Sequence, residues 1–540
     1  MNELERTGQQ GDAPVVAILN PARLIAGLWL ILLVWSFVRC PVPAVNEPHY
    51  LCKARNFIDP AWCERDFFLA SSNPHAFYYA VTGPFTQILE FEQVAVLGRA
   101  AGLLLVACGW YWLATPILTT TWQVTGSLCL FLLLQAVGNF SGEWLVGGGE
   151  SKVFSYGLAF LGCGLAVRNR WKLAAVCLGL AIAFHPLVGL WFALAWGATV
   201  FCLAARERKL LATLRSLVLP LVILILLALP GLLPALRVLQ EPVSAADQFA
   251  GNYLQVFFRL GHHLDPMRFS PRAITGYLVL TALVLLMGFK LHKSFGSESS
   301  AIRRQFHWLV GIVLFATLFA AAGYAIGWRT MPADQMPGVA WRVKLLKFYP
   351  FRLFDLIVPV AASILAVVWI SKQEWTDNLN AHSKRALALA LLPLLVGLLL
   401  PYPDARPSRM KMDIEADWRE MCAWIEDQTP AESLHVTPRR GWAFKWFAQR
   451  AEYVNFKDCP QESAGILEWN ERLRVQSDWF NGSREDELID STDLQLLRKL
   501  TGAEFLLTWN SLEISSEPEH VNGSFALYRL PESTSADSID

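Results

Sequence analysis

The strongest constraint on the fold is a series of ten apolar runs that recur throughout the first 400 residues. They cover residues 18–38, 94–113, 122–137, 153–167, 173–204, 217–236, 274–289, 306–326, 353–370 and 386–400. A helix that crosses the ~30 Å hydrocarbon core of a bilayer needs ~20 mostly apolar residues. Soluble cores do not repeat such runs, so the sequence predicts a mainly α, polytopic transmembrane helical bundle.

The fifth run is too long for one ordinary membrane helix. His185-Pro186 lies near its centre, and proline removes an amide donor and breaks a helix. We expect two helices here, which gives about eleven membrane helices in all. The first run is too long for the apolar core of a signal peptide and lacks a clear cleavage site, so we interpret it as an uncleaved anchor.

The chain changes character at residue 402. Residues 402–540 carry 15 basic and 26 acidic residues, whereas residues 1–401 carry 31 basic and 20 acidic ones. We expect a disordered cytoplasmic N-terminus (1–17), a transmembrane domain (18–401), a soluble extracytoplasmic domain (402–530) and a disordered tail (531–540). Strands that alternate with helices favour a small, mostly parallel α/β fold for the soluble domain. No basic face is present, so we expect no nucleic-acid partner.

Basic residues in short loops predict the orientation. If the spans alternate, the basic segments 168–172, 206–215, 290–304 and 372–385 share one side, which the positive-inside rule makes cytoplasmic. The loops 40–93, 138–152, 237–272 and 328–352 then lie outside with the soluble domain. Loops held by a rigid scaffold often carry function, so we expect the site on this outer side.

The first outer loop begins with Asn46-Glu47-Pro48-His49-Tyr50-Leu51 and continues to Asp66. Positions 50, 54, 57 and 58 follow helical spacing, with charges on the other face. This pattern predicts an amphipathic helix that lies along the outer interface of the membrane. An alternative for Glu47 is that it caps this helix or lies on a solvated surface.

The second outer loop contains Glu143 and the sequence Gly147-Gly148-Gly149-Glu150-Ser151-Lys152. Three glycines make a flexible or tightly bent segment, which membrane depth tolerates only against protein or a wet cavity. Glu143 or Glu150 could face Glu47 across such a cavity. The alternative is a surface pair of Glu150 with Lys152.

Other candidates lie beside the later spans. His185 could bind a sugar hydroxyl or transfer a proton, or it could satisfy carbonyls that the neighbouring proline leaves free. Four cations stand among aromatic residues at the fourth outer loop, a combination that suits a lipid phosphate; they are Arg342, Lys344, Lys347 and Arg352. The alternatives are anchoring to lipid headgroups and an Arg352–Asp355 pair. In the soluble domain, residues 438–442 and Lys445-Trp446 form an aromatic and cationic patch. We expect this patch to dock onto the body, and the alternative is that it binds sugar.

Residues 46–51 resemble the acidic motif of the GT-C superfamily of polytopic membrane glycosyltransferases. Two further motifs resemble those of bacterial membrane proteins of this architecture: Gly149-Glu150-Ser151-Lys152 and Phe351-Arg352-Leu353-Phe354-Asp355. Members of this superfamily place an acidic motif, often Asp-Glu-x-x-Tyr, after the first span, and many carry a soluble outer domain. The chain is most similar to bacterial members of this architecture. The resemblance implies sugar transfer from a polyprenyl-phosphate-type donor to an acceptor on the outer face of the membrane.

The resemblance also suggests roles for individual residues. Glu47 matches the glutamate of the motif and is the expected base, with Asp66, Glu143 and Glu150 as further catalytic carboxylates. Binding of the substrate or its lipid phosphate is expected from His49, Tyr50, Lys152, His185, Arg342, Lys344, Lys347 and Arg352. Asn46 stands where the motif has aspartate, so the cofactor stays open, with a divalent metal as one alternative. The expected partners are the lipid bilayer and a polyprenyl-phosphate-linked sugar.

Two other functions remain open from the sequence. The broken helix and the charges inside spans also suit a transporter or flippase. Asn46 in place of aspartate suits a non-catalytic protein that binds lipid-linked glycans. In each case we expect a multi-pass protein of a bacterial inner membrane with its soluble domain outside. The sequence does not predict an oligomeric state.

Overall fold

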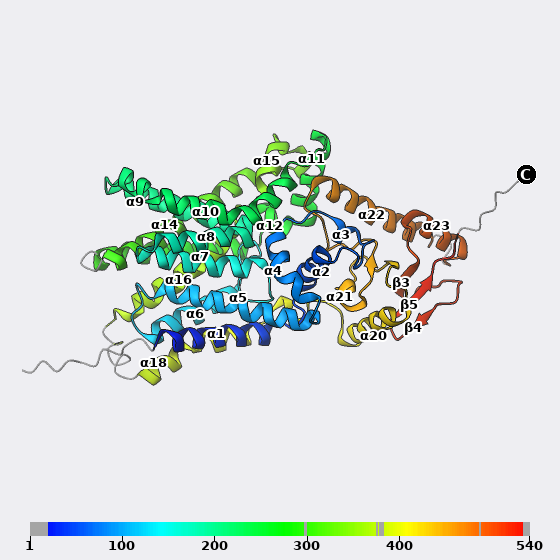
Figure 1. Cartoon of the computed structure of the whole chain (residues 1–540), viewed down its shortest axis with the longest axis horizontal. Helices are drawn as coiled ribbons and strands as arrows, with labels where there is room; N and C mark the ends of the chain where they lie inside the picture. Colours follow the sequence, from blue (N-terminus) through cyan, green and yellow to red (C-terminus); the bar gives the residue numbers. More distant parts are fainter. Residues whose placement is uncertain (1–19, 296–299, 374–375, 377–382, 485–487, 533–540) are drawn as a thin grey trace, which may run out of the picture.

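The computed structural model describes residues 20–295, 300–373, 376, 383–484 and 488–532. It shows an elongated molecule in which a bundle of long helices carries a smaller domain with a sheet at one end (Figure 1). The expected N-terminal segment (1–17) lies outside the described residues. Of the expected tail (531–540), only residues 531 and 532 are described.

Each of the eleven expected membrane segments is helical. Within the described residues, seven helices are long and apolar enough to cross a membrane: α1 (Pro21–Arg39), α5 (Phe91–Ala114), α9 (Pro186–Arg206), α10 (Leu210–Leu239), α13 (Pro271–Ser294), α14 (Ser300–Gly327) and α16 (Arg352–Ser371). Three apolar helices are shorter: α6 (Thr121–Val137), α7 (Ser151–Val167) and α8 (Trp171–Phe184). The last segment is split into α18 (Ser383–Ala390) and α19 (Leu392–Leu399). The predicted polytopic helical bundle is therefore confirmed.

Two sets of loops occupy opposite ends of the bundle. The loops that we expect outside meet the C-terminal domain, where α11 (Ala245–Tyr253) packs on α22 (Ser463–Gly482). At the other end the basic loops meet one another, and Arg304 donates a hydrogen bond to Asn169. This arrangement is the one that alternating spans require. Which end faces the cytoplasm stays a prediction.

The C-terminal domain contains a five-stranded sheet of order β2-β1-β3-β5-β4. β1 (Leu434–Val436) pairs in parallel with β2 (Ala451–Glu452) and β3 (Phe505–Trp509), whereas β5 (Phe525–Arg529) is antiparallel to β3 and β4 (His520–Val521). The predicted α/β fold is confirmed, but the sheet is mixed rather than mostly parallel. No helix separates β3 from β5, so these strands do not have the long crossover that parallel pairing needs.

Helices cover both faces of this sheet because successive side chains of a strand point to opposite sides. Phe505 and Leu507 of β3 pack on α20 (Met412–Gln428), which contributes Trp418. Leu506 faces the other side, where α22 and α23 (Ser491–Thr501) supply apolar residues such as Leu497.

A helix, α2 (Glu47–Ile58), follows the first span, as the amphipathic pattern predicts. It packs on α4 (Ala76–Thr86) and on α21 (Phe444–Ala448) of the C-terminal domain. Its apolar face contacts protein, since Ala54 packs with Tyr78 and Tyr79 of α4. Gly83 permits this approach, because a Cβ there would lie 2.5 Å from the carbonyl oxygen of Ala54. That α2 lies along the outer interface of the membrane stays a prediction.

A buried histidine in the sheet predicts that the C-terminal domain loses stability in mild acid. His435 of β1 is 0 % exposed and stacks on Phe505, and burial lowers its pKa from 6.5 to about 3. Below pH 6.5 the unfolded chain binds a proton that the folded domain excludes, so stability falls by about 2 kcal/mol between pH 7 and pH 5. His435→Phe should remove this loss in pulse proteolysis of the purified protein; an unchanged pH dependence would contradict it.

Candidate functional site

The loop between α6 and α7 carries Glu143 and Glu150, and carboxylates of other elements hold both of its ends. At the first end, Asp355 of α16 accepts hydrogen bonds from the backbone N–H groups of Phe140 (2.6 Å), Ser141 (2.7 Å) and Glu143 (2.9 Å). Asp355 is 0 % exposed. A buried carboxylate so supplied with donors fixes the loop at the depth of the span.

Glu47 holds the second end of the loop together with Arg99 of α5. The two carboxylate oxygens of Glu47 lie 2.7 and 2.9 Å from guanidinium nitrogens of Arg99, and they accept N–H groups of Gly149 (2.7 Å) and Ala44 (2.6 Å). Gly148 packs closely against Ala44, because a Cβ at position 148 would lie 2.6 Å from the Cβ of Ala44. A residue without a side chain is therefore needed at this position.

This geometry does not favour Glu47 as a base. Its side chain is 0 % exposed, and its oxygens are occupied by fixed donors of the fold. A general base must reach the proton that it removes. Neither alternative for Glu47 is observed: its side chain is not solvated, and it accepts an N–H of Ala44 before α2 rather than one from the first turn of the helix.

Between the two held ends, four charged side chains form the feature that we call the Glu143 cluster: Glu143, Glu150, Lys152 and Arg352. Glu143 Oε2 lies 3.2 Å from Arg352 Nε and 3.9 Å from Lys152 Nζ. Glu150 Oε2 lies 3.3 Å from the same ammonium group. All four side chains are at most 14 % exposed. The cluster thus combines two carboxylates and two cations in a shielded place.

Aromatic and histidine side chains surround the Glu143 cluster. Arg352 Nη1 lies 3.1 Å from His185 Nε2, and its guanidinium group lies over the ring of Tyr349 at 4.1 Å. The ring centroids of His75 and His185 are 4.7 Å apart, and that of Tyr50 is 5.5 Å from His75. His185 also accepts the N–H of Val188 at 3.4 Å and so caps α9.

Several buried polar atoms at this place lack a well-formed hydrogen bond within the described residues. They are Glu143 Oε1, Ser151 Oγ, the Tyr156 hydroxyl and His75 Nδ1. Leaving one such atom unsatisfied costs about 1–3 kcal/mol, so native proteins usually supply a water or ligand there. The cluster therefore has unused capacity to bind a polar molecule that also offers negative charge to Arg352 and Lys152.

The other late cations lie apart from the cluster. Arg342 donates to the carbonyl groups of Ile326 (3.0 Å) and Trp328 (3.1 Å). Lys347 Nζ donates to Asn252 Oδ1 at 2.8 Å, and Lys344 and Lys347 line a separate cavity of about 170 Å³. The alternative Arg352–Asp355 pair does not form, since Arg352 pairs with Glu143 and Asp355 accepts backbone N–H groups.

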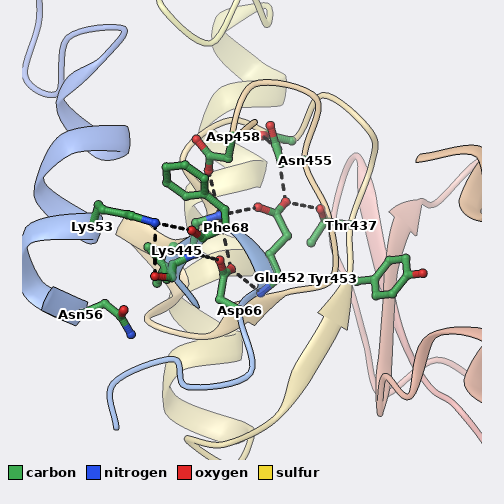
Figure 2. A network of polar contacts seen from close by, with 12 residues as sticks. Lys53, Asn56, Asp66, Phe68, Thr437, Lys445, Glu452, Tyr453, Asn455 and Asp458 are labelled. Carbon is green, nitrogen blue, oxygen red and sulfur yellow. Dashed lines mark hydrogen bonds and ion pairs between the residues drawn. The ribbon is translucent and has the colours of Figure 1, made fainter. Parts of the chain in front are cut away.

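Asp66 and His49 belong to a second network, which joins the first outer loop to the C-terminal domain. Figure 2 shows Asp66 of this network with Lys445, Glu452 and Asp458. The centre of the network is Lys445 of α21, whose ammonium group lies 2.8 Å from Asp458, 3.0 Å from Glu452 and 3.4 Å from Asp66. His49 Nδ1 lies 3.0 Å from Asp458. We call these five residues the Lys445 network.

Electrostatics within the Lys445 network differ between its carboxylates. Burial alone would raise the pKa of Asp458, but the Lys445 ammonium group outweighs burial and holds this pKa below its ordinary value. For Glu452 burial prevails and raises the pKa. The neighbouring Trp446 donates to Glu92 at 2.7 Å. The Lys445-Trp446 pair thus docks the domain, as predicted.

The donor set of the Glu143 cluster does not suit a metal ion. Among the described residues, no group of three or more His, Cys, Asp and Glu side chains has the geometry to hold one. A divalent cation shared by Glu143 and Glu150 would need carboxylate oxygens and water as its ligands. The ammonium group of Lys152 lies within 4 Å of both carboxylates and occupies that place. The cluster therefore does not fit a metal-assisted step.

Sequence reasoning did not identify three residues that shape the site: Arg99, Tyr156 and, as a loop anchor, Asp355. Arg99 and Asp355 stand inside apolar runs, and a charge in a membrane span usually has a specific partner. That signal marks both positions. The partners themselves, Glu47 and the amides near Ser141, come from distant parts of the chain.

Comparisons with known proteins give similarities of two kinds, to a family model and to solved structures. A family model described as a domain of unknown function (DUF6798) matches residues 416–475, which lie in the C-terminal domain. A solved structure, the oligosaccharyltransferase of Archaeoglobus fulgidus in complex with zinc and sulfate, aligns with 90 % of this chain and 68 % of its own, at 13 % identity and a TM-score of 0.47. No curated protein matches the chain.

Proposed function

We propose that this protein is a GT-C-like membrane glycosyltransferase. It transfers a sugar from a polyprenyl-phosphate-type donor to an acceptor at the end of the bundle that carries the C-terminal domain. The observation that supports this most is the Glu143 cluster, where a carboxylate with one unpaired oxygen lies against two cations. The helical bundle with its soluble domain and the motif resemblance agree with the proposal.

Glycosyl transfer makes two demands on a site. A base must take the proton of the acceptor hydroxyl. The hydroxyl oxygen then bonds to the anomeric carbon of the sugar, while the bond from that carbon to the donor phosphate oxygen breaks. The departing phosphate then carries negative charge that cations must stabilise. Glu143 Oε1 is our choice for the base. Arg352 and Lys152 are placed to bind the phosphate, and Arg352 is oriented by Tyr349 and His185.

Glu150 has a different part in this proposal. Its Oε1 accepts a hydrogen bond from Asn46 Nδ2 at 3.2 Å, and its Oε2 faces Lys152. Both oxygens are engaged, so Glu150 orients the ammonium group rather than removing a proton. Asn46, which replaces the aspartate of the family motif, thus serves as a hydrogen-bond donor.

Binding of the donor would also free the base. Without a donor, the Glu143 carboxylate contacts both Arg352 and Lys152. A donor phosphate that takes over these two cations would release Glu143 from its ion pairs, so that its side chain can turn toward the acceptor hydroxyl.

The direct test is transfer of radiolabelled hexose from a polyprenyl-phosphate-linked donor by purified protein in nanodiscs. A cell-envelope extract serves as acceptor source, and the loss of label from the lipid fraction is followed. Glu143→Gln keeps the shape but removes the base, so we expect a loss of about 100-fold or more. Glu207→Gln is the control, because Glu207 is exposed at the opposite end.

Three outcomes would contradict this proposal. Wild-type turnover in Glu143→Gln would exclude Glu143 as the base. Tight binding of the donor by the wild-type protein with no turnover would instead support a non-catalytic protein that binds lipid-linked glycans. Movement of the intact donor across a liposome membrane, without a covalent product, would support a flippase.

A further inference from the structure

A second candidate site lies at the end of the bundle opposite the C-terminal domain. Here a groove of about 590 Å³ runs between the turn that joins α7 to α8 and the side of α10. The helices α8 and α10 pack side by side (Figure 1). The residues of the groove that matter for its chemistry are Arg170, Trp171, Lys172, Leu173, Ser216 and Leu219.

The groove is positively charged, and its cations are available. Within the described residues, Lys172 makes no ion pair or side-chain hydrogen bond, and the Arg170 guanidinium group only lies 5.9 Å from the ring of Trp112. The neighbouring Arg168 differs, since it donates to Trp112 O (2.8 Å), Gly164 O (2.9 Å) and Thr115 Oγ1 (2.7 Å). No acidic residue lines the groove. Two uncompensated cations therefore favour an anionic ligand.

The walls of the groove continue into a surface that suits acyl chains. Leu173 is 51 % exposed, Leu219 is 50 % exposed and Val218 is 60 % exposed. The spanning part of α10 is among the least buried of the candidate spans, so it presents its apolar side chains to lipid. A ligand in the groove can thus place charge at the cations and hydrocarbon along α10.

Trp171 indicates that this groove lies at the depth of the membrane–water interface. Its ring stacks on Trp196 with centroids 6.1 Å apart and lies 5.6 Å from Trp308. Tryptophan collects at the interface of membrane proteins because its ring is apolar and its N–H is polar. The position next to Arg170 and Lys172 is therefore the depth of lipid phosphate groups.

We propose that this groove binds the headgroup of an anionic phospholipid, with its phosphate between Arg170 and Lys172 and its acyl chains along Leu173 and Leu219. Basic pockets between membrane helices have the features that select anionic over zwitterionic lipids. A choline or ethanolamine headgroup would bring its own cation toward the two basic residues. The site is separate from the Glu143 cluster and does not depend on the proposed transfer reaction.

Native mass spectrometry of the full-length protein tests this proposal. Detergent-purified protein is titrated with phosphatidylglycerol and, in parallel, with phosphatidylcholine of the same chains. We expect one tightly retained phosphatidylglycerol molecule. The double variant Arg170→Gln, Lys172→Gln should weaken its retention roughly tenfold to thirtyfold, because it removes both cations. The variant Arg208→Gln, Lys209→Gln makes the same charge change at the same end, outside the groove, and should keep the wild-type affinity.

Three results would overturn the proposal. Equal losses in the two double variants would mean that overall charge, and not the groove, attracts the lipid. Equal retention of phosphatidylcholine would remove the role of the cations. Displacement by millimolar inorganic phosphate would show that the groove binds a free anion without acyl chains. Thermal unfolding of both double variants at the wild-type temperature confirms that they are folded.

Discussion

Lys445→Met is expected to weaken the docking of the C-terminal domain by about 3–5 kcal/mol, because it leaves buried carboxylates without their cation. Asp66, Glu452 and Asp458 all lie within 3.4 Å of the Lys445 ammonium group. Asp66 belongs to the first outer loop and the other two to the domain. Removing the lysine therefore turns an attraction between the two parts into repulsion.

Hydrogen exchange of the purified protein measures this effect. We expect faster exchange in α2 and in residues 444–458 of the variant, and easier proteolysis of the domain. Lys499→Met is the matched control, since this lysine is exposed on α23. Mild acid should restore part of the docking in Lys445→Met, because Glu452, whose pKa burial raises, becomes neutral first. Protection equal to that of the wild type at pH 7 would show that the network does not hold the domain.

Glu47→Gln is expected to destabilise the bundle by about 3–5 kcal/mol, since it leaves the Arg99 guanidinium group buried without a carboxylate. Arg99 is 1 % exposed, and among the described residues its other hydrogen-bond acceptors are the carbonyl groups of Cys40 and Pro41. The amide that replaces a carboxylate oxygen would also face N–H donors of Gly149 or Ala44. The loop that carries Glu150 would lose its anchor.

Thermal unfolding in detergent separates this role from catalysis. Glu47→Gln should lower the unfolding temperature, whereas Glu64→Gln, an exposed change in the same outer loop, should not. Glu143→Gln should also fold normally, because its partner Arg352 keeps contacts with His185 and Tyr349. A Glu47→Gln protein that is as stable as wild type but inactive would restore Glu47 as the base that the motif predicts.

The bundle was predictable because spanning a bilayer needs a length and a composition that the sequence displays directly. The break at His185-Pro186 follows from the backbone N–H that proline lacks, and α8 ends at Phe184. The order of strands in the C-terminal domain was less accessible. β4 contains only His520 and Val521, which is too short for an alternating pattern, and its hairpin with β5 makes the sheet mixed.

The candidate site was predictable in its residue types but not in its pairings. Five of the expected site residues lie together, namely Glu143, Glu150, Lys152, His185 and Arg352, whereas others such as Arg342 lie elsewhere. Glu47 stands in the acidic motif at residues 46–51 but pairs with Arg99, because an arginine inside an apolar run needs a buried partner of opposite charge. Lys344 and Lys347 have the same composition signal as Arg352, yet the chain turns them toward Asn252 and another cavity.

The central claim is that Arg352 and Lys152 hold the phosphate of a polyprenyl-linked donor beside Glu143, and photo-crosslinking tests it most directly. A polyprenyl phosphate analogue with a diazirine next to the phosphate is irradiated with the purified protein, and the labelled peptides are sequenced. We predict label in residues 138–152 and at the start of α16, lost in Arg352→Gln and retained in Arg268→Gln, which changes an exposed arginine. Label confined to α15 (Val339–Leu346) near Lys344 and Lys347, with none near Glu143, would contradict the claim.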